Sequence, residues 1–123
     1  PMQWHMNLIR TNQAWMRLAA LNPANRMGDP TTQIAIFDSG IQEDFNGQSS
    51  NPDFRAQVGG MNKITEFYDF GSNPGVDNNS YAGTEHGTVV AGIAAANGDK
   101  VNGSVGVTPG SRLKGYIFST DQA

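Results

Sequence analysis

The sequence predicts an α/β protein whose core is an open, mostly parallel β-sheet. Three short runs rich in β-branched and aromatic residues, at 33–37, 63–70 and 112–118, have the length and composition of strands. The first run lacks the polar alternation of a half-exposed strand, which is typical of a strand buried on both faces. Long segments separate the runs, as crossovers between parallel strands require.

The length, net charge and composition of the chain limit the possible folds and argue against several functions. The 123 residues suit one domain or one piece of a domain. A formal net charge of −3 without any Lys or Arg cluster argues against binding to nucleic acid or to an anionic membrane surface. The chain has no cysteine, so it forms no disulfide and no thiolate metal site. No apolar run approaches the roughly 18 residues of a membrane span.

The N-terminal segment is predicted to be helical. Within residues 3–21, bulky apolar side chains recur at helical intervals and predict one or two short helices lying on a core. They are Trp4, Leu8, Trp15 and Leu18. His5 lies on the polar flank of this stripe and is interpreted as a surface histidine. Two prolines and a glycine in 22–31 then end the helix and begin a surface loop.

The middle of the chain is expected to alternate loops with regular elements. Residues 42–60 are polar and rich in turn formers, so a long loop follows the first strand. A second loop is expected at 71–83, after the second strand. The small and β-branched residues of 86–96 suit a helix packed closely on a sheet, and one more loop leads to the third strand.

Two side chains occupy places where catalytic groups gather in such a sheet. Asp38 ends the first strand, and the carboxyl ends of parallel strands meet at one edge. A simple turn capped by the carboxylate explains Asp38-Ser39-Gly40 equally well when that motif is taken alone. His86 begins the predicted helix, whose dipole disfavours an imidazolium there. If Asp38 accepts a hydrogen bond from Nδ1, it leaves Nε2 free to take a proton and stabilises the resulting cation.

These motifs resemble the subtilisin-like serine proteases in content and order. The matching stretches are "QWHMNLIRTNQAW" at 3–15, "AIFDSGI" at 35–41, "EHGTVVAGIAAA" at 85–96 and "GVTPGSRLKGYIF" at 106–118. Any one of them would be weak evidence, whereas several in the same order are strong. The resemblance implies that Asp38 is the orienting carboxylate and His86 the general base. It also implies a subtilisin-like sheet with helices on both faces, incomplete in this chain.

The resemblance further implies parts that this chain lacks. In the family the nucleophile is a serine in a Gly-Thr-Ser-x-Ala context, and an asparagine donates to the oxyanion. The serines considered, Ser39, Ser49, Ser104 and Ser119, do not stand in that context. We therefore expect residues 1–123 to be the N-terminal part of a catalytic domain, completed by a second polypeptide with the serine and the asparagine. The expected substrate is a peptide or protein, and the expected location is extracellular, with signal and propeptide absent from this chain.

The resemblance also suggests a structural calcium ion. The stretch "NPDF" at 51–54 is similar to the family's His-Pro-Asp-Leu segment, which makes Asp53 a candidate ligand. Gln3, Asp99 and Asn102 are the further candidates. Calcium takes six to eight oxygen ligands, of which backbone carbonyls can supply several. Solvated polar loops remain the alternative, because "NPDF" follows an insertion and the second loop matches poorly.

Two other functions stay open at this point. The tetrapeptide "FDSG" at 37–40 also resembles the Asp-Thr/Ser-Gly motif of aspartic proteases, although that interpretation leaves the His86 motif unexplained. The absence of a recognisable nucleophile permits a catalytically silent fragment, or pseudoprotease, that acts as a binding module.

Overall fold

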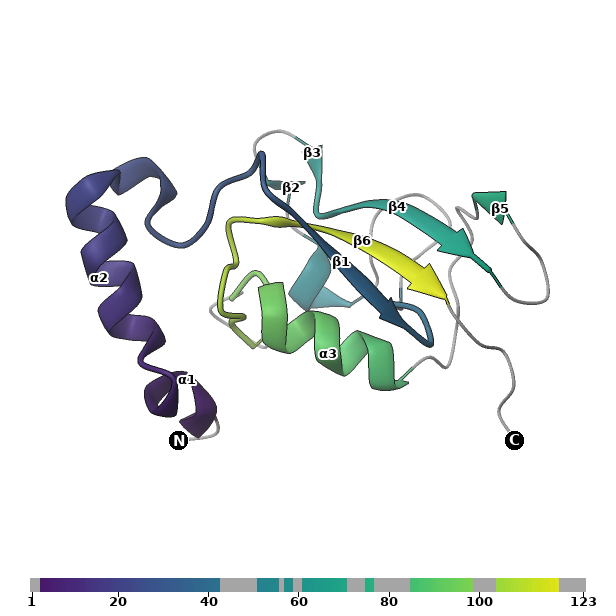
Figure 1. Cartoon of the computed structure of the whole chain (residues 1–123), viewed down its shortest axis with the longest axis horizontal. Coiled ribbons are helices and arrows are strands. Elements are labelled where there is room, and N and C mark those ends of the chain that lie inside the picture. The colour runs from purple at the N-terminus through teal and green to yellow at the C-terminus, as the bar shows by residue number, and fades with distance from the viewer. Residues whose placement is uncertain are drawn as a thin grey trace.

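A computed structural model of the chain describes residues 3–42, 51–55, 57–58, 61–70, 75–76, 85–98 and 104–117. Within these residues a four-stranded sheet carries one helix packed on it, and a helical segment lies to one side (Figure 1). The predicted α/β fold class is confirmed.

The N-terminal segment is helical, as predicted, but its apolar stripe does not lie on a core within the described residues, because Trp4, Leu8 and Leu18 are 67%, 71% and 44% exposed. It forms α1 (Trp4–Leu8), α2 (Thr11–Leu21) and the 3₁₀ turn η1 (Pro23–Asn25). Two side chains tie this segment to the loop before the last strand. Gln3 Nε2 donates to the Val105 carbonyl at 2.6 Å, and Trp15 Nε1 donates to the Val107 carbonyl at 2.9 Å. Within the described ranges, no helix is both long enough and apolar enough to cross a membrane.

The main sheet has three parallel strands and one short antiparallel strand. Its order is β1 (Gln33–Asp38), β6 (Arg112–Ile117), β4 (Ile64–Asp69) and β5 (Gly75–Val76). The first three run parallel and coincide with the predicted runs, whereas β5 pairs antiparallel with β4. The sequence does not predict β5, the two-residue strands β2 (Gln57–Val58) and β3 (Met61–Asn62), or the 3₁₀ turn η2 (Pro52–Phe54). Of these, η2 and β2 fall in the loop expected at 42–60, and β5 falls in the loop expected at 71–83.

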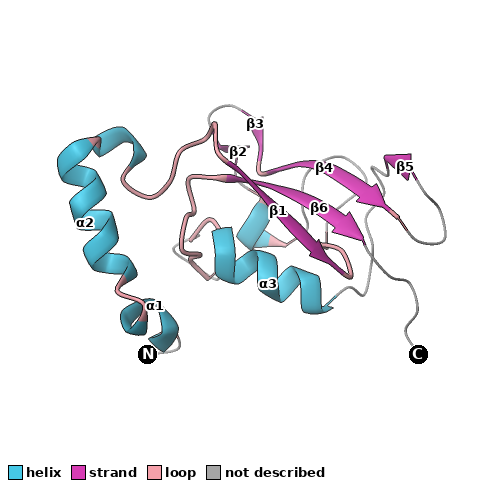
Figure 2. Cartoon of the chain, viewed as in Figure 1, coloured by secondary structure: helices cyan, strands magenta, loops and turns pink. Residues whose placement is uncertain are grey.

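Helix α3 (Glu85–Ala95) covers one face of the sheet (Figure 2). Its residues Ala91 and Ala95 are completely buried, and their small side chains let the helix backbone lie close to the strands. Because side chains alternate between faces along a strand, Asp38 shares the α3 face with Ile36. The buried apolar cluster on this side comprises Ile36, Ile41, Phe54, Ile64, Phe67, Ala91, Ala95 and Leu113.

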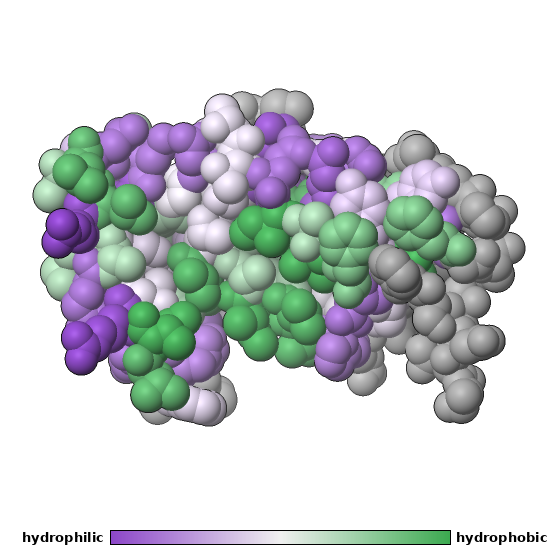
Figure 3. Space-filling model, in the orientation of Figure 1, coloured by the Kyte–Doolittle hydropathy of each residue, from purple (hydrophilic) through white to green (hydrophobic). Residues whose placement is uncertain are grey.

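The opposite face of the sheet carries aromatic rings near the carboxyl ends of the strands. Phe37 and Tyr116 stack with ring centroids 4.7 Å apart, and Tyr68 and Phe70 lie 4.4 Å apart. Phe37 is 58% exposed and Phe70 is 51% exposed. In the space-filling view, apolar side chains gather over the middle of the molecule, where β1 and α3 lie (Figure 3). The predicted helical cover is therefore present on the α3 face, while these rings remain accessible on the other.

A buried lysine joins the starts of β4 and β6. The Lys63 side chain is only 1% exposed, and its Nζ donates to the carbonyls of Pro109 and Ser111, each at 2.6 Å. Burial lowers the pKa of Lys63 to about 8. The ammonium thus holds the loop that leads into β6 against the strand that lies beside it.

Candidate active site

Asp38 is the last residue of β1, at the carboxyl edge of the parallel sheet. Its side chain is 18% exposed, so the carboxylate is shielded from most of the solvent. The backbone N–H of Ser39 donates to Asp38 Oδ1 at 2.7 Å, which fixes one oxygen in the turn that follows the strand. The strand end and this turn together hold the carboxylate on the α3 side.

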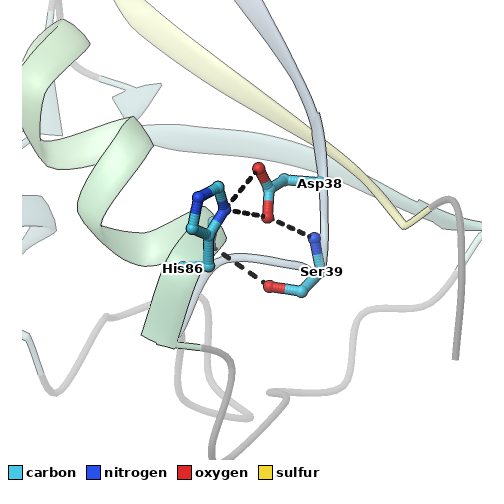
Figure 4. Close-up of polar contacts among 4 residues, drawn as sticks. Asp38, Ser39 and His86 are labelled. Carbon is cyan, nitrogen blue, oxygen red and sulfur yellow. Dashed lines mark hydrogen bonds and ion pairs between the residues drawn. The ribbon is translucent and has the colours of Figure 1, made fainter. Parts of the chain in front are cut away.

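His86 is the second residue of α3, and its ring meets the Asp38 carboxylate (Figure 4). Nδ1 lies 2.8 Å from both Oδ1 and Oδ2 of Asp38. The imidazole is otherwise open, because the His86 side chain is 78% exposed. The structure therefore brings together the two catalytic candidates proposed from the sequence, in the relation that orients a general base. Their catalytic roles remain a prediction.

Two glycines allow α3 to approach the end of β1 this closely. Gly40 has a φ of +113°, a backbone conformation that residues other than glycine rarely adopt. A Cβ added at Gly87 would lie 2.1 Å from the Gly40 carbonyl oxygen and 3.1 Å from the Asp38 Cβ. Only glycine therefore fits at either position without moving the helix or the turn.

Two hydroxyl groups connect the turn after β1 to the first turn of α3. The Gly87 N–H donates to Ser39 Oγ at 3.2 Å (Figure 4). The Gln42 N–H donates to Thr88 Oγ1 at 2.9 Å. Sequence reasoning missed both connections, and the available signal was the pair of hydroxyl residues placed directly after Asp38 and Gly87.

The local electrostatics keep Asp38 ionised. Burial raises the pKa of Asp38, but the hydrogen bonds from Ser39 and His86 lower it by more, so the net pKa lies below its ordinary value. The carboxylate is therefore a hydrogen-bond acceptor at neutral pH, and it accepts from the Nδ1–H of His86. With that proton committed to Asp38, Nε2 is the ring atom left to exchange a proton with a substrate or a nucleophile.

The calcium candidates divide between described and undescribed residues. Gln3 and Asp53 line one cavity of about 360 Å³, together with Ser104. Both oxygens of Asp53 already accept hydrogen bonds from Ser104, one from its N–H and one from its hydroxyl, each at 2.7 Å. Asp99 and Asn102 lie outside the described residues. Within the described part of the chain, no three His, Cys, Asp or Glu side chains gather as a metal site, so calcium remains a prediction.

His5 differs from its interpretation as a surface histidine. Its side chain is half-buried and lines the same cavity as Asp53. The Nε2 atom is completely buried and has no hydrogen-bond partner among the residues that the structure describes. The stripe pattern of α1 predicted a solvent-facing ring, because the residues of η2 and α3 that line this cavity with His5 are distant in the sequence.

The two described serines with hydroxyls near these sites have structural partners. Ser39 Oγ accepts from the Gly87 N–H, and Ser104 Oγ donates to Asp53. Ser49 and Ser119 lie outside the described residues. We nominate none of these four as a nucleophile.

Comparisons with known proteins identify the family. A profile described as "Subtilase family" matches residues 29–123, a span that contains both Asp38 and His86. The chain belongs to the subtilase family. The aspartic-protease interpretation of "FDSG" is therefore wrong. A curated subtilase-like relative, "Halolysin" of Haloferax mediterranei, is 34% identical over 93 residues. That alignment covers 76% of this chain but 16% of halolysin, and no solved structure matches the chain.

Proposed function

We propose that this subtilase chain forms part of a serine endopeptidase, in which Asp38 orients His86 and His86 acts as the general base. The observation that carries the proposal is the pair of 2.8 Å contacts from Nδ1 to the ionised carboxylate. Membership of the subtilase family and the similarity to halolysin support the same reaction class. The substrate class that follows is a peptide or protein.

The residues on this chain account for the proton transfers. Nε2 of His86 takes the proton of a serine hydroxyl as its oxygen attacks the peptide carbonyl carbon. Asp38 stabilises the imidazolium formed in that step while holding the ring in place. The imidazolium then returns the proton to the leaving amine as the peptide C–N bond breaks, which restores the neutral base.

The serine and the oxyanion-binding asparagine are proposed to lie on a second polypeptide. The sequence contains no serine in the family's nucleophile context, and the chain spans about 16% of the length of halolysin. The second polypeptide would also supply the substrate pockets. An extracellular location belongs to the same proposal, as does a structural calcium ion held by Gln3, Asp53, Asp99 and Asn102.

The alternative function is a silent subtilase fragment that acts as a binding module, favoured by the absence of a recognisable nucleophile. A fluorophosphonate probe distinguishes the protease from the binding module. It is applied to the purified chain together with everything that co-elutes with it. The protease proposal predicts one labelled partner polypeptide. It also predicts that His86→Ala abolishes labelling while assembly persists, and that Asp38→Asn reduces labelling by a similar or smaller factor. Equal labelling of both variants and the native chain would refute the assigned roles, and no label on any polypeptide would favour the binding module.

A further inference from the structure

The turn that follows β1 is held to α3 by a hydrogen bond that touches neither catalytic candidate in the pair. Thr88 Oγ1 accepts from the Gln42 N–H at 2.9 Å, across 46 positions of sequence. We propose that Thr88 is a positioning residue for the pair. By accepting this bond it fixes the first turn of α3 along β1, and so sets the distance from His86 Nδ1 to Asp38. The inference rests on the proposed function, because it assigns Thr88 a part in the same reaction.

The position of His86 depends on where α3 begins, because its ring is mostly exposed and its contact in the described part of the chain is with Asp38. Its side chain is 78% exposed, whereas the Asp38 side chain is 18% exposed and is fixed at the end of a strand. The helix is anchored to the sheet through the methyl groups of Ala91 and Ala95, one to three turns beyond His86. Contacts between methyl groups set the distance from helix to sheet but give little resistance to sliding along the helix axis.

The glycine contact limits the approach of α3 without holding it. The close packing of Gly87 on Gly40 prevents a nearer approach, because even an added Cβ at Gly87 would lie only 2.1 Å from the Gly40 carbonyl oxygen. Directional bonds are needed to prevent the helix from moving away or along the strand. The far end of α3 is held by the N–H groups of Val107 and Thr108, which donate to the carbonyls of Ile93 and Ala94. The first turn of α3 is bonded to the turn after β1 from Gly87 to Ser39 at 3.2 Å and from Gln42 to Thr88 at 2.9 Å. The second is the shorter of the two.

Thr88 is the cleaner of the two hydroxyls to test. Ser39 also bonds to Asp38, and its hydroxyl contributes to lowering the pKa of that carboxylate. A Ser39 substitution would therefore change the acid as well as the helix position. Thr88 lies two residues beyond His86 on the same helical turn, so a shift at Thr88 moves the histidine backbone with it.

The expected consequence is a loss of turnover rather than of substrate affinity. Displacement of a catalytic group by about 1 Å can cost on the order of a hundredfold in rate. Loss of one neutral hydrogen bond allows a smaller average displacement than that. We therefore expect Thr88→Val to lower kcat about tenfold with KM nearly unchanged. Thr88→Ser keeps the acceptor oxygen and should restore the native kcat.

The test uses two readouts on three variants. Thr88→Val and Thr88→Ser are compared with Thr65→Val, which removes a half-buried hydroxyl that donates to the Leu113 carbonyl at 3.2 Å, within the sheet. The first readout is the rate at which the His86 Nδ1 proton exchanges with water, measured by nitrogen-edited NMR on the full chain. The second is kcat of the chain with its co-eluting partner, measured on a peptide substrate.

Faster exchange of this proton in Thr88→Val alone would support the inference, with an expected increase of about tenfold. An exchange rate in Thr88→Val equal to the native rate would overturn it. An equal increase in Thr65→Val would also overturn it, because general loss of stability would then suffice. If even the native sample fails to hydrolyse peptide or take up the fluorophosphonate, the proposed function fails, and the exchange rates still decide the role of Thr88.

Discussion

Replacement of Gly87 by alanine tests how the catalytic pair is assembled. An added Cβ would lie 2.1 Å from the Gly40 carbonyl oxygen, and real Cβ atoms essentially never come within 3.0 Å of such an atom. The start of α3 must therefore retreat by about 1 Å. A retreat along the same direction lengthens the 2.8 Å contact from His86 Nδ1 to Asp38 to about 3.8 Å, which is too long for a hydrogen bond. The predicted result is a kcat about a hundredfold lower.

The sign of the change in unfolding free energy of Gly87→Ala is also informative. Glycine to alanine inside a helix ordinarily stabilises a protein by about 1 kcal/mol. Forcing a methyl group into an occupied space costs about 1–3 kcal/mol, so Gly87→Ala should be neutral or destabilising. The measurement is the free energy of unfolding in urea, followed by circular dichroism.

A matched control lies on the same helix. An added Cβ at Gly92 meets no heavy atom within 4 Å, so Gly92→Ala should gain the full helix-propensity term and raise Tm by about 4 °C. If Gly87→Ala raises the stability as much as Gly92→Ala and keeps the native kcat, the proposed packing of α3 against the turn after β1 is wrong.

Three further predictions concern charge and metal. Lys63 has a folded pKa of about 8 against an ordinary 10.5, so the unfolded chain binds more protons between these values. The unfolding free energy should therefore rise from pH 8 to 10.5, by at most about 3 kcal/mol, and this rise should vanish in Lys63→Met. The pKa of Asp38 is lowered from its ordinary value of 3.8, so the stabilising hydrogen bonds of this carboxylate should persist at pH 3.8 and be lost only as the pH falls further. A titration of the Asp38 carboxyl carbon above pH 3.8, followed by NMR, would contradict this. If calcium binds at Asp53, a chelator should lower Tm in the native chain and leave Asp53→Asn unchanged.

The elements with strong local patterns were predictable from the sequence. The apolar, β-branched run at 33–37 became β1, as predicted. Its predicted burial on both faces is wrong for the described residues: Ile36 is buried under α3, whereas Phe37 on the other face is 58% exposed and β1 is an end strand of the sheet. The alanine-rich segment became α3 because small side chains allow close packing on a sheet. The proximity of Asp38 and His86 could be predicted because one ends a parallel strand and the other begins the crossover helix.

The missed features all arise from tertiary contacts that leave little local pattern. The strand β5 is two residues long and exists by pairing with β4. The buried face of His5 depends on the neighbours that line its cavity. The bond from Gln42 to Thr88 joins positions that only the completed fold brings together. Charge on a buried lysine is likewise sustained by carbonyls that are distant in sequence, those of Pro109 and Ser111.

The most direct test of the account is the tautomer of His86 at neutral pH, read from the nitrogen-15 NMR shifts of its ring. We expect the neutral ring to carry its proton on Nδ1, bonded to Asp38, with Nε2 unprotonated, and Asp38→Ala to remove this preference. A ring protonated on Nε2, or a tautomer that does not respond to the loss of the carboxylate, would contradict it.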